Sequence, residues 1–160
     1  MLKSLFCMIL GFAVLYTCMS SSSSATQNII VSINGKRLSY SESPINVDGR
    51  ILIPAAALKE EPDIAVEWVG NTKALVITHA VKSITIYLKI GQPGALVNGS
   101  EKELEGTPEI FNGRAFVPLR FIFESMGAKV EWNGTMKTVN ITYEGTEQEK
   151  SPILPMPWDF

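Results

Sequence analysis

The chain has 160 residues, of which 46% are hydrophobic and 19% charged, a composition typical of a globular protein and unlike that of a disordered or fibrous one. A net charge of −2 gives no basis for a nucleic acid or an acidic membrane surface as partner. Both cysteines, Cys7 and Cys18, lie near the N-terminus, so the rest of the chain is predicted to fold without disulfides or thiol chemistry.

Residues 1–25 are predicted to be a signal peptide. Lys3 gives a positive start, residues 5–19 are almost uninterruptedly apolar, and residues 20–25 supply the small side chains of a cleavage site. The apolar run is shorter than the roughly 18–20 residues that span a bilayer. We therefore expect a secreted or cell-surface protein that begins near Thr26 and has no membrane span. An alternative is a lipid anchor at Cys18, although the two residues before it fit a lipoprotein cleavage site poorly.

The sequence repeats itself without a gap at an offset of 64 residues. Most matched residues are types that dictate backbone conformation. The matched pairs are Asn34-Gly35 with Asn98-Gly99, Pro44 with Pro108, Gly49-Arg50 with Gly113-Arg114, Pro54 with Pro118, Val66-Glu67-Trp68 with Val130-Glu131-Trp132, and Gly70, Lys73 and Ile77-Thr78 with Gly134, Lys137 and Ile141-Thr142. We predict one domain over residues 26–144, made of two repeats at 28–80 and 92–144.

Strands are predicted from turn residues and from apolar alternation. Each Asn-Gly pair favours a two-residue hairpin turn, which predicts one hairpin over residues 29–40 and its counterpart over 95–104. Alternation predicts a central strand at 83–90 that joins the repeats, and a last strand at 138–143 with Val139, Ile141 and Tyr143 on its buried face. The first and last hairpins are too small to be stable alone, so we expect them to pair with each other.

Each repeat also predicts a short helix that begins at a proline. In the second repeat Leu119, Ile122, Phe123 and Met126 form one apolar stripe, and Gly127 can end the helix in a left-handed conformation. In the first repeat Pro62 limits the helix to about two turns. We expect Trp68 and Trp132 to be buried, each beneath the helix of its own repeat. The predicted fold is α+β, with antiparallel meander sheets packed against two short helices.

The motif formed by Asn98-Gly99, residues 113–132 and residues 137–141, with a weaker copy at 34–77, resembles the copper amine oxidase N-terminal-like, or stalk, domain. Exported proteins of Firmicutes carry many such domains. The resemblance implies a meander sheet against helices, remote from any oxidase chemistry. Copper in such an oxidase needs several imidazoles, and the whole chain has one histidine. No catalytic residue, cofactor or metal ligand is therefore predicted.

Other chemically active residues are interpreted as structural. His79 aligns with Tyr143 between the repeats, which favours a residue on the strand surface, or a satisfied one at the strand edge, over a metal ligand. Arg50 and Arg114 each follow a turn glycine, where pairing with local groups is favoured over anion binding. We expect Glu67 and Glu131 to pair with Lys73 and Lys137 on the surface, rather than to form the carboxylate pair of a glycosidase.

The sequence thus predicts a non-catalytic exported module, structural or binding, whose partner is a protein or a cell-wall polymer. One alternative is a cell-wall hydrolase or another secreted enzyme with an unrecognised site. Another is an inhibitor that acts through residues 145–160, a predicted flexible tail that contains Trp158 and Phe160. The candidate residues are those of the structural motif: Asn34, Gly35, Gly49, Arg50, Pro54, Trp68, Asn98, Gly99, Gly113, Arg114, Pro118, Gly127 and Trp132.

Overall fold

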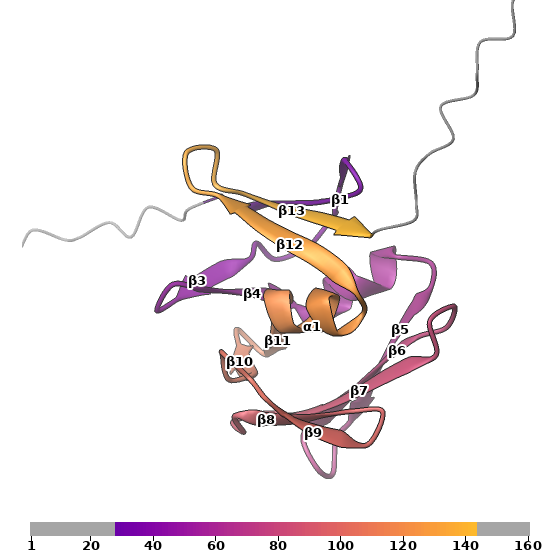
Figure 1. Ribbon diagram of the computed structural model, residues 1–160. Coiled ribbons are helices and arrows are strands. Elements are labelled where there is room, and N and C mark those ends of the chain that lie inside the picture. Colours follow the sequence, from indigo (N-terminus) through magenta and orange to yellow (C-terminus); the bar gives the residue numbers. More distant parts are fainter. Residues whose placement is uncertain (1–27, 144–160) are drawn as a thin grey trace, which may run out of the picture.

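A computed structural model describes residues 28–143, which form three small β-sheets with two short helices packed between the outer two (Figure 1). The predicted signal peptide and the predicted tail lie outside the described residues. All strand pairs in the described part of the chain are antiparallel except one. The fold is therefore mostly antiparallel β-sheet, with helix confined to two short segments.

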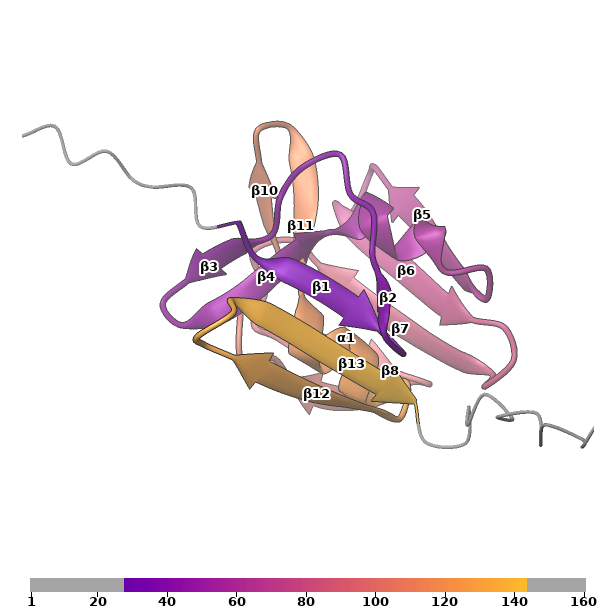
Figure 2. The same ribbon diagram turned by 90° about the horizontal axis from the view of Figure 1, so that it is seen from above.

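The first outer sheet joins the two ends of the described chain. Its strand order is β12 (Ala128–Asn133), β13 (Thr138–Tyr143), β1 (Ile30–Ile33) and β2 (Lys36–Arg37). β1 and β13 are the one parallel pair, and Figure 2 looks down on them side by side. The prediction that the first and last hairpins pair with each other is confirmed.

The asparagine of each Asn-Gly turn also binds the neighbouring strand. Asn34 has a positive φ of 49°; its N–H donates to the Ile141 carbonyl at 2.8 Å, and its Oδ1 accepts from the Tyr143 N–H at 3.0 Å. Asn98 does the same with Thr85 of the central strand, at 2.8 Å and 2.7 Å. Each asparagine therefore has two roles. It adopts the left-handed conformation of the turn, and its side chain accepts a hydrogen bond from the neighbouring strand.

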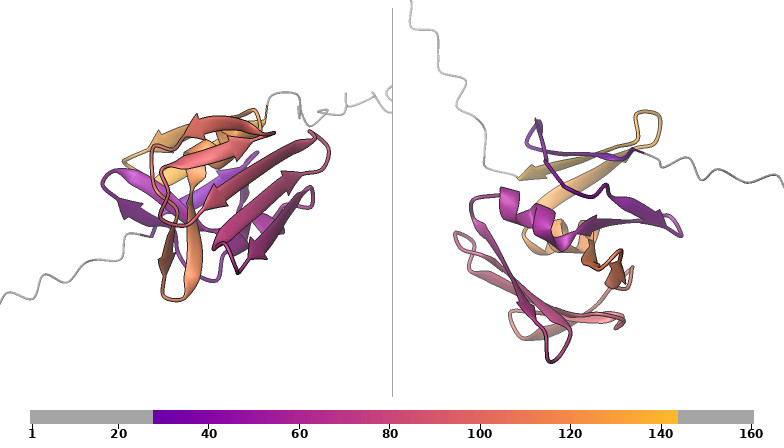
Figure 3. Two further views of the ribbon diagram at one scale, coloured as in Figure 1. Left: turned by 90° about the horizontal axis from the view of Figure 1, so that it is seen from below. Right: turned by 180° about the vertical axis from the view of Figure 1, so that it is seen from behind.

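The second outer sheet is a five-stranded meander in chain order, seen from below in Figure 3. Its strands are β5 (Ile64–Val69), β6 (Ala74–His79), β7 (Ile84–Lys89), β8 (Gly94–Val97) and β9 (Ser100–Glu103). The strand predicted at 83–90 is β7, between β6 and β8. Its alternation is as expected: Ile86 and Leu88 are fully buried, whereas Thr85 and Lys89 are exposed.

The central sheet lies between the outer two and has the order β10 (Glu109–Phe111), β11 (Arg114–Pro118), β4 (Arg50–Pro54) and β3 (Ile45–Val47). In its middle, β4 and β11 pair antiparallel with Ile53 opposite Val117. These two residues are 64 positions apart and both are fully buried. The flanking pairs, Pro54 with Phe116 and Leu52 with Pro118, are reciprocal about that point.

The two helices follow these central strands directly. The 3-10 helix η1 (Ala55–Glu60) packs on β5 and β11, and α1 (Leu119–Ser125) packs on β12 and β4 (Figure 3). The predicted stripe of α1 is fully buried, in one core cluster with Val31, Ile33, Val139 and Ile141. Gly127 has the expected positive φ of 75°, but Pro118 is the residue before the first helical position rather than the first position itself.

Candidate functional site

Trp68 and Trp132 are half-exposed, at 46% and 41%, so the expectation that each is buried beneath a helix is wrong. Both lie on the inward face of their strands, in line with Ile64 of β5 and Ala128 of β12, each of which is 6% exposed. The helices have only six and seven residues, and burial decreases from the start of each strand toward its tryptophan. The alternation of the strands is consistent with tryptophans on the inward face of the sheet. It could not show that the short helices end before they cover the two indoles.

A glycine two residues after each tryptophan gives the indole room. Trp68 Nε1 lies 3.5 Å from the point where a Cβ of Gly70 would stand, and Trp132 Nε1 lies 3.4 Å from the same point at Gly134. Each ring can therefore lie along its own turn, because that position has no side chain. In both cases the indole Nε1 lies beside the glycine of the turn that follows the strand.

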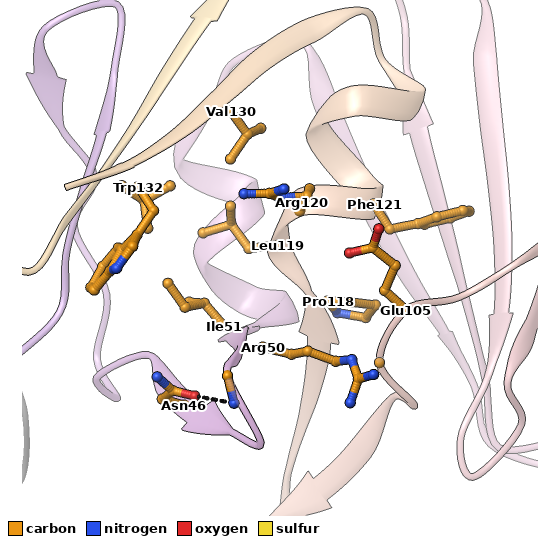
Figure 4. Close-up of a pocket in the computed structure, with 13 residues that line it drawn as sticks. Asn46, Arg50, Ile51, Glu105, Pro118, Leu119, Arg120, Phe121, Val130 and Trp132 are labelled. Carbon is orange, nitrogen blue, oxygen red and sulfur yellow. Dashed lines mark hydrogen bonds between the residues drawn. The ribbon is translucent and has the colours of Figure 1, made fainter. Parts of the chain in front are cut away.

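Trp132 lines a cavity of about 220 Å³, here called the Trp132 cleft (Figure 4). Its walls are the end of β12, the start of α1 and the turn between β3 and β4. In Figure 4 Trp132 and Arg50 come from opposite walls, and Arg120 projects from the start of the helix. The lining residues are Asn46, Gly49, Arg50, Ile51, Glu105, Gly106, Pro118, Leu119, Arg120, Phe121, Val130, Trp132 and Val139.

Trp68 lines a second cavity, of about 400 Å³, called the Trp68 cleft. Its lining residues are Pro54, Ala55, Ala56, Lys59, Val66, Trp68, Leu75, Ile110, Gly113, Arg114 and Ala115. All of them except Lys59 stand 64 positions from a residue that lines the Trp132 cleft. Each cleft thus joins a tryptophan from one part of the chain to an arginine turn from the other part.

The structure therefore brings together eight of the predicted motif residues in two groups of four: Trp132, Pro118, Gly49 and Arg50 in one, and Trp68, Pro54, Gly113 and Arg114 in the other. The other five line neither cleft: Asn34, Gly35, Asn98 and Gly99 form hairpin turns, and Gly127 ends α1. No feature of the sequence indicates this grouping, because the lining residues are far apart in the chain: residues 46 to 139 line one cleft and residues 54 to 115 the other.

Both arginines are placed by the same kind of turn. Asp48 and Gly49 have φ of 50° and 82°, and Asn112 and Gly113 have φ of 51° and 75°. Two consecutive residues with positive φ are the pattern of a two-residue hairpin turn, which only glycine and a few small polar residues accept readily. Arg50 and Arg114 are consequently the first residues of β4 and β11.

The two arginines differ in their partners. Arg114 forms an ion pair with Glu42 and donates to Ser41 Oγ at 3.3 Å, which confirms the expected pairing with a local carboxylate for this residue. The position corresponding to Glu42 is Gly106, and a Cβ built there would lie 3.2 Å from Arg50 Cδ. Within residues 28–143 the Arg50 guanidinium has neither an ion pair nor a hydrogen bond, so the expected pairing is not found for it.

The expected ion pairs of the two glutamates are also not found. Glu131 pairs with Lys129, at 2.7 Å, rather than with Lys137. Lys73 and Lys137 instead have positive φ of 52° and 49° in the turns that follow β5 and β12. Both glutamates are exposed and neither lines a tryptophan cleft, so they do not form a carboxylate pair at one site.

His79 is buried rather than on the strand surface, with 7% of its area exposed. Its ring meets the ring of Tyr143 edge-on, with centroids 6.0 Å apart, so residues that align at the 64-residue offset are in contact. Lys82 Nζ lies 4.1 Å from the Tyr143 ring centroid and donates to the Met126 carbonyl at 2.7 Å. Burial, then the negative charges of Glu61 and Asp63, raise the pKa of Tyr143 to about 12.

Residues 32–146 match the family model of the copper amine oxidase N-terminal domain. The chain belongs to this family. The domain is the N-terminal, non-catalytic part of copper amine oxidases, so membership brings no oxidase chemistry with it. Within residues 28–143 no group of three or more His, Cys, Asp or Glu side chains could hold a metal ion, and neither helix there is long and apolar enough to cross a membrane.

The chain is also similar to a protein of Brevibacillus choshinensis named protease inhibitor, with 26% identity over 134 residues. The aligned part is 84% of this chain, and it spans 39% of the length of that relative.

Proposed function

We propose that this stalk-type domain is an exported, non-catalytic binding module of the cell surface or cell wall, and that its ligand lies in the two tryptophan clefts. The observation that carries the proposal is the pair of half-exposed tryptophans, each opposite an arginine turn. Tryptophan offers a large apolar face together with an N–H donor, and tryptophan and arginine are enriched where binding energy concentrates.

The residues of the clefts favour binding over hydrolysis. Among the described residues that line them, Glu105 is the sole carboxylate and there is no histidine. Glycoside hydrolysis uses two carboxylates on either side of the scissile bond, and acyl transfer uses a nucleophile beside a base. The cell-wall hydrolase considered from the sequence is thus the weaker alternative.

We infer in addition that residues 28–80 and 92–144 are two copies of one unit, joined by the strand at 83–90 within a domain of residues 26–144. The reciprocal pairing about Ile53 and Val117 and the matched linings of the clefts support this. The motif residues outside the clefts then have structural roles, as hairpin turns and a helix end. Because each cleft takes residues from both copies, a single copy would have no complete cleft.

Export through the signal peptide at 1–25 is part of this proposal. Mass spectrometry of the protein from culture supernatant or wall fractions should give a new N-terminus near Thr26. A diacylglyceryl group on Cys18 would instead indicate a lipid anchor. An intact Met1 in the cytosolic fraction would contradict export.

Binding can be tested by co-sedimentation of residues 26–160 with insoluble cell wall. Replacing both cleft tryptophans with alanine should abolish co-sedimentation, because each cleft loses its apolar wall. Trp158→Ala is the matched control, since it removes a tryptophan of the predicted tail and should leave binding intact. Retained binding in the double variant, with an unchanged circular dichroism spectrum, would contradict a role for the clefts.

A second candidate, protease inhibition, is favoured by the printed name of the Brevibacillus choshinensis relative. It is tested by adding residues 26–160 to a panel of secreted proteases and measuring the remaining activity. Inhibition that disappears when residues 145–160 are deleted would support the inhibitor that acts through its aromatic tail. Inhibition without any binding to cell wall would replace the binding proposal.

A further inference from the structure

We propose that the Trp132 cleft selects an anionic glycan, one whose sugar stacks on Trp132 while its carboxylate or phosphate is bound by Arg50. The inference rests on the proposed binding function and adds a ligand class to one of the two clefts. It also assigns the clefts different chemistry, with the Trp68 cleft lacking the selection for an anion.

First, the two arginines differ in whether a carboxylate pairs with them in the described part of the chain. Glu42 forms an ion pair with Arg114 of the Trp68 cleft. The corresponding position beside Arg50 is Gly106. Gly106 packs against the aliphatic part of Arg50, 3.2 Å from Cδ to the point of a Cβ, and brings no charge. The planar guanidinium presents a fork of donors that matches the geometry of a carboxylate or phosphate. The Arg50 guanidinium of the Trp132 cleft is therefore available to a ligand, whereas the Arg114 guanidinium of the Trp68 cleft is paired with Glu42.

Second, the other residues that line the Trp132 cleft are more polar than their counterparts in the Trp68 cleft. Arg120 and Asn46 line the Trp132 cleft, where the Trp68 cleft has Ala56 and Ile110. Arg120 is half-exposed and has a long contact of 3.8 Å with Glu124, which leaves it free to turn toward a ligand. Asn46 Oδ1 accepts from the Gly49 N–H at 2.9 Å, which directs its amide group into place on the cleft wall (Figure 4).

The charged side chains that line the Trp132 cleft are Arg50, Glu105 and Arg120. Glu105 is the carboxylate there, and it has no ion pair with Arg50 or Arg120 in the described part of the chain. Two guanidiniums therefore face one carboxylate. In the Trp68 cleft the cation left after Arg114 pairs with Glu42 is Lys59, a flexible point charge without a planar fork.

Third, Trp132 lines the same cavity as Arg50 and Arg120. Its indole forms one side of the cavity of about 220 Å³ and Arg50 belongs to the opposite side, so a ligand that stacks on the indole and binds Arg50 has to extend across the cavity. An aromatic face with polar groups at its edge suits a sugar, which has an apolar ring face and hydroxyl groups around it. An acidic group further along the glycan would then reach the unpaired guanidinium of Arg50 on the opposite side.

The test uses fluorescence of residues 26–160 with one cleft tryptophan left at a time. Trp68→Phe with Trp158→Phe reports on the Trp132 cleft, and Trp132→Phe with Trp158→Phe reports on the Trp68 cleft. The probes are chitotetraose as the neutral glycan, soluble peptidoglycan fragments as the carboxylate-bearing glycan, and a wall polymer of sugar-phosphate repeats as the phosphate-bearing glycan. We expect an anionic probe to bind the Trp132 cleft about tenfold or more tightly than chitotetraose, and less tightly as salt increases.

Substitutions of Arg50 test whether its guanidinium causes the preference for anionic probes. Arg50→Gln should weaken binding of the anionic probe by about tenfold or more and so remove its preference over chitotetraose. Arg50→Lys keeps the charge without the fork and should give an intermediate value. Arg114→Gln is the matched control and should change neither probe in the Trp132 cleft.

Substitutions at the positions beside the two arginines, 106 and 42, test whether the preference for anions can be removed from one cleft and introduced into the other. Gly106→Glu places a carboxylate beside Arg50 and should abolish the preference of the Trp132 cleft. Glu42→Gln releases Arg114 and should give the Trp68 cleft a preference for anions. Unchanged melting temperatures would show that these variants act through charge rather than through loss of fold.

The outcomes separate this inference from the proposed function. Equal binding of neutral and anionic probes, unaffected by Arg50→Gln, would overturn the anion selection and leave the binding module standing. No fluorescence response at either tryptophan with any probe would overturn both. A response to peptidoglycan fragments alone, or to the sugar-phosphate polymer alone, would support the inference and identify the carboxylate or the phosphate as the group recognised.

Discussion

At the scale of single residues, similar side chains have different roles because their neighbours differ. Arg50 and Arg114 follow equivalent turns, yet one is unpaired in the described part of the chain and the other is held by Glu42. Trp68 and Trp132 point inward from their strands but extend past the short helices that would cover them. The arginines and tryptophans therefore combine into clefts, which separate motifs in the sequence did not reveal.

The exposure of the tryptophans leads to a prediction about stability. Trp132→Ala should cost about 1–2 kcal/mol, because much of the indole already contacts water, whereas a fully buried aromatic costs about 3–5 kcal/mol. Phe123→Ala, in the same half of the domain and fully buried, is the control expected to show the larger loss. Urea denaturation of the two variants measures the difference. Equal losses would mean that Trp132 is packed as tightly as Phe123.

At the scale of elements, the most consequential pairing is between β1 and β13, at the two ends of the described chain. The strands are parallel, with Val31 opposite Val139 and Ile33 opposite Ile141. The carbonyls of Lys137 and Ile141 accept hydrogen bonds from Ile30 and Asn34, so alternate residues of β13 face β1. The other residues of β13, such as Asn140 opposite Glu131, face β12. β13 thus depends on the first hairpin for about half of its backbone partners.

Deleting residues 26–40 should therefore unfold the last hairpin. Hydrogen exchange should show lost amide protection at Val139 and Ile141, which face β1, and also at Asn140, which faces β12. Deleting residues 145–160 is the control and should leave all three amides protected. If Asn140 stays protected after the N-terminal deletion, the last hairpin is stable without β1, and the two ends of the domain fold independently.

At the scale of the whole molecule, one core cluster includes residues from all three sheets and both helices. The outer sheets also meet at one point, where His79 of β6 contacts Tyr143 of β13 and Lys82 lies over the tyrosine ring. Burial of the phenol, and after it the negative charges of Glu61 and Asp63, disfavours the ionised form and raises the pKa of Tyr143 to about 12, from an ordinary value of 10.0. The junction of the sheets is thus coupled to the protonation of one side chain.

This coupling predicts a loss of stability in alkaline solution. Because the pKa of Tyr143 is higher in the folded state, the protonated phenol stabilises the fold fully below pH 10, and this contribution is lost as the pH rises toward 12. The phenol is partly exposed, so after screening by solvent we expect a loss of about 1 kcal/mol. Urea denaturation of the wild type and of Tyr143→Phe measures it, since phenylalanine cannot ionise. If both proteins lose stability in parallel through this range, Tyr143 is not the group responsible.

The sequence by itself determined much of the local structure. Positive φ at Asn-Gly and Asp-Gly pairs, alternation along β7 and β13, the apolar stripe of α1 and the end of that helix at Gly127 all follow from backbone sterics and the burial of apolar side chains. The family was also accessible from these residues, because the motif consists of the turns and helix ends that define the fold.

Only the tertiary structure decided how the local elements combine. Nothing in β4 or β11 alone indicates that Ile53 lies opposite Val117, since an apolar strand can pair with many partners in many registers. The burial of Trp132 depended on where the seven residues of α1 end, and the partner of each arginine depended on whether position 42 or 106 holds a carboxylate. These properties arise between residues far apart in the chain, and the candidate binding site consists entirely of them.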